Sequence, residues 1–250
     1  MLIIMGPMNL TIDIGNTRAK FVFFDVQGTV VEERSTPLED FERTLKNLMG
    51  VYSIDKCAFC SVAGNIEEVE QALQILSCPI LKVTGETELP IAVAYRSRHT
   101  LGADRVAAVA GGIQLYPTSD LMIVDAGTCI TVDVVSASEG YLGGNISPGV
   151  SMRFKAMHTM TARLPLVDCV EDAPNLGIDT VSAMRAGVIQ GVNFELEGYV
   201  NYWQKRLPHL KVIITGGNHH LLGAVEKNDW VYEHLLVSIG LNSLLNNLIR

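Results

Sequence analysis

The sequence lacks long hydrophobic runs and is short of positive charge. It has no stretch of about 18 apolar residues and no basic segment at its start, so we predict neither a membrane-spanning helix nor a secretion signal. Lys and Arg number 19 against 27 Asp and Glu, which gives a net charge of −8. Nucleic-acid and anionic-membrane binders need a clustered basic face, so we expect no nucleic acid and no membrane as partners. Small anions stay open as ligands, because a local site can oppose the global charge.

The chain also lacks the composition of a disordered protein. Hydrophobic residues make up 48% and charged residues 18%, and no segment is of low complexity. A chain of 250 residues can bury a core as one large domain or two small ones.

Recognisable cysteine and histidine sites are missing as well. The odd count of five cysteines, without a secretion signal, suggests a reducing cytosol, so we expect a cytoplasmic location. Cys57 and Cys60 have the spacing of zinc and redox motifs, but they lie in an apolar strand pattern and no second pair follows. We therefore predict core cysteines. The remaining ones are Cys78, Cys129 and Cys169. The six histidines form no ligand pattern.

What is present is an alternation of strand and helix patterns. Strands are expected over 10–14, 19–24, 54–62, 79–84, 122–125, 130–134 and 211–215. Helices are expected over 38–49, 65–76, 102–115, 179–206 and 234–248. This order belongs to the α/β class.

One short pattern occurs twice. Both 12–17 and 124–128 read as strand, Asp, any residue, Gly and then Thr, and a second strand follows each. The two aspartates, Asp13 and Asp125, stand 112 positions apart, nearly half the chain. The repeat predicts two similar halves, 1–117 and 118–250.

Each repeated turn has features of a phosphate site. Glycine lets the backbone approach a ligand and present N–H groups, and Thr17 and Thr128 add hydroxyl donors. Lys20 can place a charge on a phosphate, while an Asp can hold a hydrated cation. One copy alone could be an ordinary β-turn, whereas two facing copies would grip a polyphosphate from both sides. Neither Gly-x-x-x-x-Gly-Lys-Ser/Thr nor a strand-linked Gly-x-Gly-x-x-Gly occurs, which excludes the P-loop and Rossmann alternatives.

Two further stretches have functional and structural interpretations. In 102–105, Gly-Ala-Asp-Arg at a helix start, Arg105 can pair with a carboxylate while Asp104 accepts a proton. Alternatively, Asp104 caps the helix and Arg105 is solvated. The Gly-rich stretch 140–149 either packs around a site or forms turns.

Together these motifs resemble the type III pantothenate kinases of the acetate and sugar kinase/Hsp70/actin superfamily. The resemblance extends from Asn9 over nearly the whole chain, with all motifs in the family's order. The motifs are Asp13-x-Gly15-Asn16-Thr17-x-x-Lys20, Gly102-Ala103-Asp104-Arg105, Asp125-x-Gly127-Thr128-x-x-Thr131-x-Asp133, Gly143-Gly144-x-x-x-Pro148-Gly149 and Thr215-Gly216-Gly217. The resemblance implies an α/β fold of two similar ribonuclease H-like, actin-like domains facing a nucleotide cleft. The first phosphate loop and catalytic Asp would lie in one domain, the second loop and adenosine motif in the other.

The resemblance also implies an activity: ATP-dependent phosphorylation of pantothenate to 4'-phosphopantothenate, the first step of coenzyme A synthesis. It implies ATP with Mg²⁺, a monovalent cation (K⁺ or NH₄⁺) and a homodimer. The family's proton acceptor falls on Asp104 and its monovalent-cation position on Asp125. The implied ATP contacts are Asp13, Ile14, Gly15, Asn16, Thr17, Arg18, Ala19, Lys20, Thr128, Gly216 and Gly217. The implied pantothenate contacts are Tyr95, Gly102, Ala103, Asp104, Arg105 and Thr180.

Some departures and alternatives accompany this assignment. Cys129 stands where the family often has Ala, and Tyr95 and Thr180 are placed by weaker motifs. A non-catalytic regulatory relative of the same fold is one alternative, and a different small-molecule kinase of the superfamily is another. Retention of Lys20, Asp104 and both turns argues against the first. Residues and spacing alone lead to an ATP-using phosphotransferase, and the substrate comes from the resemblance.

Overall fold

A computed structural model of the chain describes residues 5–64, 66–168, 173–222 and 230–249. The chain divides into two compact units. The first unit comprises Met1–Ile91, Tyr95–Tyr116 and Leu235–Arg250, and the second comprises Ala92–Ala94 and Pro117–His234. Within the described residues, no helix combines the length and apolarity needed to cross a membrane. Two positions named by the sequence analysis, Cys169 and the expected helix start at Asn65, lie outside the described residues.

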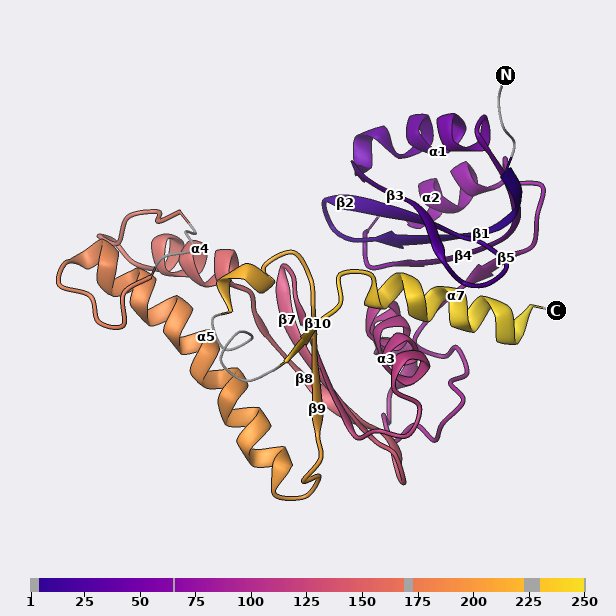
Figure 1. The fold of residues 1–250 in the computed structure, drawn as a ribbon. Helices are drawn as coiled ribbons and strands as arrows, with labels where there is room; N and C mark the ends of the chain where they lie inside the picture. Colours follow the sequence, from indigo (N-terminus) through magenta and orange to yellow (C-terminus); the bar gives the residue numbers. More distant parts are fainter. Residues whose placement is uncertain (1–4, 65, 169–172, 223–229, 250) are drawn as a thin grey trace. The chain divides into compact units, whose positions relative to one another are not determined.

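The first unit is built on a five-stranded sheet with the order β3-β2-β1-β4-β5 (Figure 1). Its strands are β1 (Met5–Ile14), β2 (Arg18–Phe24), β3 (Val30–Pro37), β4 (Tyr52–Ser61) and β5 (Ile80–Lys82). The central strand β1 pairs antiparallel with β2 and parallel with β4. Alternating side chains of β1, such as Leu10, Ile12 and Ile14, enter the core, as the period of a strand requires.

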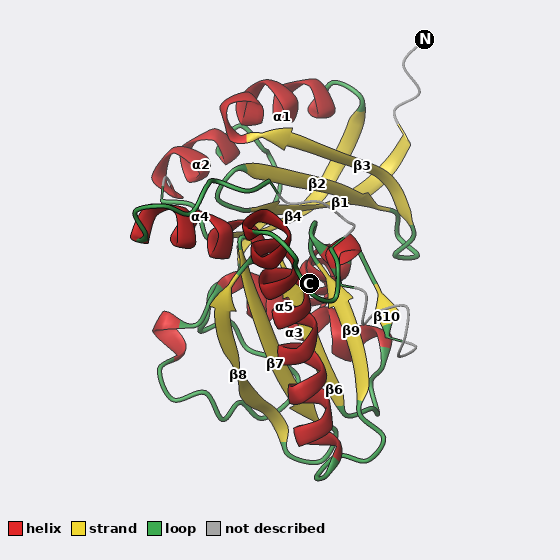
Figure 2. Ribbon diagram, turned by 90° about the vertical axis from the view of Figure 1, so that its left-hand side faces the viewer, coloured by secondary structure: helices red, strands yellow, loops and turns green. Residues whose placement is uncertain are grey.

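Helices cover both faces of this sheet (Figure 2). They are α1 (Phe41–Met49), α2 (Ile66–Leu73), α3 (Ala103–Leu115) and α7 (Leu236–Leu248), with short 3₁₀ turns at Leu38–Asp40 and Arg98–Thr100. Apolar side chains of α1 and α2 pack with β1 on one face, while Leu235 and Ile239 pack with Val22 and Phe24 on the other.

The second unit repeats the same plan. Its sheet has the order β10-β9-β6-β7-β8. The strands are β6 (Leu121–Ala126), β7 (Cys129–Ser136), β8 (Gly140–Pro148), β9 (Lys211–Thr215) and β10 (Val231–Tyr232). The central strand β6 pairs antiparallel with β7 and parallel with β9. Apolar side chains of α4 (Val150–Met160) and α5 (Thr180–Gln204) form one core with β6, β7 and β9, and a 3₁₀ turn spans His219–Leu221.

The two sheets therefore have the same connectivity, with β1 to β5 matching β6 to β10 in order and direction. The α/β class and the duplicated strand–turn–strand expected from the sequence are both present. The units differ from the expected halves 1–117 and 118–250 in the last helix, which packs with the first unit. A Cβ on Gly111 of α3 would collide with the Leu236 carbonyl, and one on Gly240 of α7 with the Ala107 carbonyl, so glycine permits this close helix packing.

Among the described residues, the strands and α-helices that the sequence analysis missed are β3, β8, α4 and β10. The Gly-rich stretch 140–149, expected to form turns or site packing, is mostly the strand β8. The cysteine prediction is confirmed for Cys57 and Cys60, which are buried free thiols in β4. Burial raises the pKa of both thiols, which disfavours the reactive thiolate.

Candidate active site

The first candidate turn joins β1 to β2 in the first unit. The Gly15 N–H donates to the Arg18 carbonyl at 2.9 Å and closes the turn. The glycine amide is therefore used within the turn, in contrast to the expectation that it would face a ligand. Asn16 and Thr17 are exposed at the tip, and no described residue accepts a hydrogen bond from their N–H groups. These two amides are the backbone donors that the turn leaves for an anion.

Asp13 lies at the end of β1 with two functional neighbours. In the sheet register it is opposite Lys20 of β2 and Cys60 of β4. The Cys60 thiol donates to Asp13 Oδ1 at 3.5 Å. Burial and the charge of Asp104 raise the pKa of Asp13 to about 6, against smaller opposing effects of the thiol and Lys20. Asp13 and Asp104 thus share one electrostatic neighbourhood in this unit.

Asp104 occupies the first turn of α3. The N-cap is Gly102, so Asp104 does not cap the helix as the structural alternative proposed. Its Oδ1 accepts the Arg105 backbone N–H at 2.8 Å. Burial raises the pKa of Asp104, and the Arg105 N–H and charge oppose this. A Cβ on Gly102 would collide with Asp104 Oδ1, so glycine leaves the space in which this carboxylate sits.

Arg105 and Tyr95, two of the implied pantothenate contacts, lie close to each other in the first unit. The Arg105 guanidinium is 5.6 Å from the centroid of the Tyr95 ring, within cation–π range. Arg105 is only 4% exposed, which contradicts the alternative that it is solvated. Ala103 is also buried at the start of the helix. The first unit thus holds the carboxylates of Asp13 and Asp104 together with two cations, Lys20 and Arg105.

The second candidate turn joins β6 to β7 in the second unit. The Gly127 N–H donates to the Cys129 carbonyl at 3.0 Å, so this glycine also closes its own turn. Thr128 is exposed at the tip. Gly149, the N-cap of α4 directly after β8, packs against the turn: a Cβ there would collide with the carbonyls of Gly127 and Thr128.

Asp125 lies at the end of β6 among oxygen-bearing side chains. The register places it opposite Thr131 of β7 and Thr215 of β9. Gly216 follows with φ +91°, and a Cβ there would collide with Asp125 and Ala126. The described residues contain no group of three or more His, Cys, Asp and Glu side chains able to hold a metal. A cation at Asp125 would thus take its other ligands from hydroxyl, carbonyl or ligand oxygens.

Gly217 and Thr180 differ from these residues in having open surroundings. Gly217 is exposed, and a Cβ added there would meet nothing within 4 Å. Thr180 is the first residue of α5, behind the N-cap Asp179, whose carboxylate accepts the Ser182 N–H at 2.9 Å.

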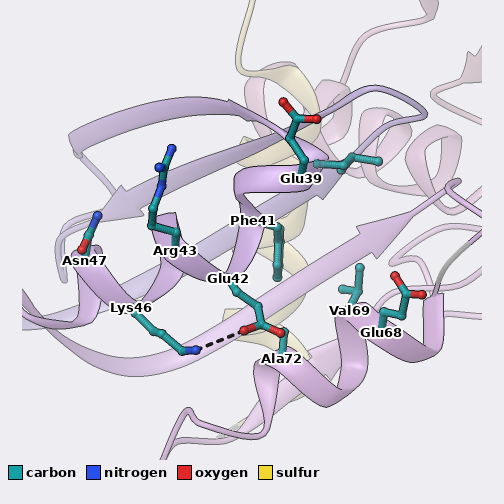
Figure 3. A pocket seen from close by; sticks show the side chains of 10 residues that line it. Glu39, Phe41, Glu42, Arg43, Lys46, Asn47, Glu68, Val69 and Ala72 are labelled. Atoms are coloured by element: carbon teal, nitrogen blue, oxygen red, sulfur yellow. Dashed lines mark hydrogen bonds and ion pairs between the residues drawn. The ribbon is translucent and has the colours of Figure 1, made fainter.

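A surface pocket of about 670 Å³ lies elsewhere in the first unit, between α1 and α2 (Figure 3). It is lined by Leu38, Glu39, Phe41, Glu42, Arg43, Lys46, Asn47, Glu68, Val69 and Ala72. Charged side chains of both signs surround it, including the Lys46–Glu42 ion pair at 3.0 Å. It contains none of the predicted site residues.

Sequence reasoning missed three residues that contact the candidate turns. Cys60 contacts Asp13 because β1 pairs in parallel with β4, and no local sequence pattern indicates this pairing. Gly149 was quoted as part of a motif without a site role. Asn218 donates to the second turn, and its only signal was its position directly after the two glycines.

Comparisons with known proteins agree with this geometry. The family described as type III pantothenate kinase matches residues 9–202. The type III pantothenate kinase of Phocaeicola vulgatus is 38% identical over 239 residues, which are 96% of this chain and 98% of that protein.

Solved structures show the same fold. A structure from Campylobacter jejuni described as a Baf family transcriptional activator has a TM-score of 0.61 and 24% identity, over 95% of this chain and 98% of its own. A ROK family glucokinase from Streptomyces griseus, in complex with glucose and AMPPNP, has a TM-score of 0.55 and 10% identity, over 96% and 98% of the two chains. The strand order, the repeated turns and the match over most of the sequence lead to one conclusion: this chain belongs to the type III pantothenate kinase family.

Proposed function

We propose that this kinase performs the family's reaction with the residues described above. The reaction transfers the terminal phosphoryl group of ATP to the primary hydroxyl of pantothenate, giving 4'-phosphopantothenate for coenzyme A biosynthesis. The observation that carries the assignment of roles is the electrostatic coupling of Asp104 to Asp13 in the first unit. It links a candidate proton acceptor to a candidate phosphate turn within one folded unit.

The phosphates of ATP are bound by the two turns. Residues Asp13–Lys20 contribute the backbone amides of Asn16 and Thr17 and the ammonium group of Lys20. The Lys20 ammonium group forms an ion pair with the Glu33 carboxylate at 3.7 Å. Thr128 contributes its N–H and hydroxyl from the second turn. Gly216 and Gly217 follow β9 and approach the adenosine side, where the open surroundings of Gly217 leave room for a ligand.

Pantothenate is bound by Tyr95, Gly102, Ala103, Arg105 and Thr180, with its hydroxyl directed to Asp104. The hydroxyl proton passes to the Asp104 carboxylate as the oxygen attacks the terminal phosphorus. The bond from that phosphorus to the bridging oxygen breaks, and ADP leaves with the bond's electron pair. The raised pKa of Asp104 makes its carboxylate a stronger base than an exposed one, which supports this role. Arg105 offers a fixed positive charge to the carboxylate or amide region of pantothenate.

Two cations complete the site. Asp13 would hold the Mg²⁺ that accompanies ATP, because its carboxylate is destabilised by burial and by Asp104 and would be stabilised by a cation. The bound Mg²⁺ would neutralise phosphate charge. Asp125 would hold a monovalent cation, K⁺ or NH₄⁺. The hydroxyl groups of Thr131 and Thr215, on either side of Asp125 in the sheet, suit such an ion.

The working form is a cytoplasmic homodimer formed through the second unit. Large apolar side chains are exposed on α5, where Phe194 and Tyr202 are each 67% exposed and stand eight positions apart on one side of the helix. Such exposed apolar groups are typical of protein interfaces.

The test is a coupled assay of ADP formation from ATP with and without pantothenate, over a panel of small alcohols and sugars. We expect ADP formation that depends on pantothenate and K⁺. ADP formation with another alcohol and none with pantothenate would identify a different small-molecule kinase. An inactive chain with correct folding and bound ATP would identify a regulatory relative.

A further inference from the structure

The second turn is held by its carbonyl groups. The Asn218 backbone N–H donates to the Ala126 carbonyl at 2.9 Å, and the Asn218 side-chain amide donates to the Gly127 carbonyl at 3.0 Å. The Gly149 N–H donates to the Thr128 carbonyl at 3.1 Å. Three successive carbonyl groups of the turn are thus fixed by the protein, two of them by one residue.

These bonds determine where the N–H groups of the turn point. A trans peptide is planar, with its C=O and N–H directed oppositely. When the Asn218 amide holds the Gly127 carbonyl, it directs the N–H of Thr128, in the same peptide, away from Asn218. The Gly127 N–H is already used inside the turn. Among the described residues, none accepts a hydrogen bond from the Thr128 N–H, so the turn leaves this amide for an incoming group.

An asparagine suits this position for chemical reasons. The Gly127 carbonyl can only accept, so the NH₂ end of the Asn218 side chain must face it, and an aspartate of the same shape could not donate. The preceding Gly216 has φ +91°, a conformation that glycine adopts without strain, and it leads the chain back across Ala126. Asn218 is part-buried, which favours a persistent hydrogen bond.

We propose that Asn218 is a positioning residue for nucleotide binding, which fixes the direction of the Thr128 N–H toward a phosphate of ATP. This inference rests on the proposed function, in which the second turn binds ATP. It assigns no contact between Asn218 and the nucleotide, because Asn218 acts through its two hydrogen bonds to the carbonyl groups of the turn. Asn218 thus acts through the backbone of another element, β6–β7, and lies outside the residues implied by the resemblance.

The test compares steady-state kinetics of the wild-type chain with those of Asn218→Ala and Asn218→Asp. Loss of one neutral hydrogen bond predicts a rise in KM for ATP of roughly three- to ten-fold in the alanine variant. KM for ATP should rise further in the aspartate variant, because the negative charge of the aspartate repels phosphate. KM for pantothenate and kcat should stay within about two-fold, since the chemical step uses Asp104. Asn47→Asp, an exposed change of equal charge on α1, is the matched control and should leave all three constants unchanged.

Each outcome separates this inference from the proposed function. A wild-type chain without ATP- and pantothenate-dependent activity would overturn the function itself. With an active wild type, an unchanged KM for ATP in Asn218→Ala would overturn the positioning role. Parallel losses in kcat and both KM values, together with a lower melting temperature, would also overturn it, because they indicate general destabilisation. If the alanine variant fails to fold, Asn218→Ser replaces it, with the same expected rise, since a serine hydroxyl is too short to reach Gly127.

Discussion

Replacing the Asp13 carboxylate should make the protein more stable at neutral pH while impairing its activity. Folding raises the pKa of Asp13 from 3.8 to about 6, chiefly because burial disfavours the charged form. One pKa unit corresponds to about 1.4 kcal/mol, so the ionised group costs up to about 3 kcal/mol of folding free energy at pH 7. Asparagine has nearly the same shape, can still accept from the Cys60 thiol and carries no charge. Asp13→Asn should therefore recover most of this free energy.

The pH determines how much more stable than the wild type the Asp13→Asn variant should be. Below pH 3.8 the carboxyl group is protonated in both the folded and the unfolded chain, so the variant gains nothing from losing the charge. Between pH 3.8 and about 6 the folded chain binds one proton more than the unfolded chain, and the wild type loses stability as the pH rises. Above about pH 6 the difference between variant and wild type reaches its full value and stays constant.

Thermal unfolding without nucleotide and in EDTA measures this difference at pH 4, 6 and 8. For a chain of this size, about 3 kcal/mol corresponds to a rise in melting temperature of roughly 6–12 °C at pH 8, and to little change at pH 4. Asp55→Asn, at an exposed position on β4, is the control and should change stability by less than about 0.5 kcal/mol at every pH. Activity of Asp13→Asn should fall, because the proposed contact with the ATP-bound cation is lost.

Two results would refute this reasoning. If Asp13→Asn lowers the melting temperature at pH 8, the carboxylate makes a net favourable interaction in the folded chain. If the variant is more stable by the same amount at pH 4 and pH 8, the gain does not come from the charge. Asp104→Asn offers a further check, because it removes the second cause of the Asp13 pKa shift and also the cost of ionising buried Asp104, so it too should raise the melting temperature at pH 8.

The other predictions concern the proposed roles. Asp104→Asn should lower kcat by about 10²–10⁴-fold with KM for ATP nearly unchanged, and a near-normal kcat would remove Asp104 as the proton acceptor. Gly217→Ala should raise KM for ATP although its Cβ meets no protein atom, whereas Gly64→Ala, at an equally open position before α2, should not; equal KM values in the two variants would place the nucleotide elsewhere. Replacing K⁺ by Na⁺ should lower activity, and Asp125→Asn should abolish the difference between the two ions, as measured by the coupled ADP assay. Phe194→Glu should shift the chain from dimer to monomer in size-exclusion chromatography with light scattering, and an unchanged dimer would exclude this face as the interface.

The strands and helices could be predicted wherever a local sequence pattern indicated them. Apolar strand patterns bounded by Gly and Asp indicated β1, β6 and β9, and the long periodic stretch indicated α5 within two residues at each end. The edge strand β3 was missed because its sequence, rich in charged and hydroxyl residues, has no buried face to mark it. β8 was missed because its glycines and proline are typical of turns.

The assignment of the last helix could not come from any local pattern. The helix follows the second unit in sequence but packs on α3 of the first. What brings them together is the mutual approach of Gly111 and Gly240, in which each backbone occupies the space that a side chain would fill. Small residues in a helix indicate close packing, but they do not say against which partner.

The candidate site divides in the same way. The repeated motif located Asp13 and Asp125, and the helix-start motif located Asp104, because each lies on one short continuous segment. Cys60 and Asn218 were missed because they reach the turns across the sheet or from a following loop. Such contacts depend on strand register, which a single sequence leaves open.

Register also explains how one duplicated hairpin can serve two purposes. The two aspartates occupy equivalent places, each at the end of a central strand, but their neighbours differ: Lys20 and Cys60 around the first, Thr131 and Thr215 around the second. An ammonium group beside a carboxylate can attract a phosphate, whereas two hydroxyl groups beside a carboxylate can surround a weakly charged cation. A chain with a net charge of −8 cannot attract ATP by its overall field. In the proposed function the positive charge is therefore placed locally: the first hairpin carries Lys20 opposite Asp13, whereas the second carries Thr131 opposite Asp125 and is proposed to take its positive charge from a bound ion.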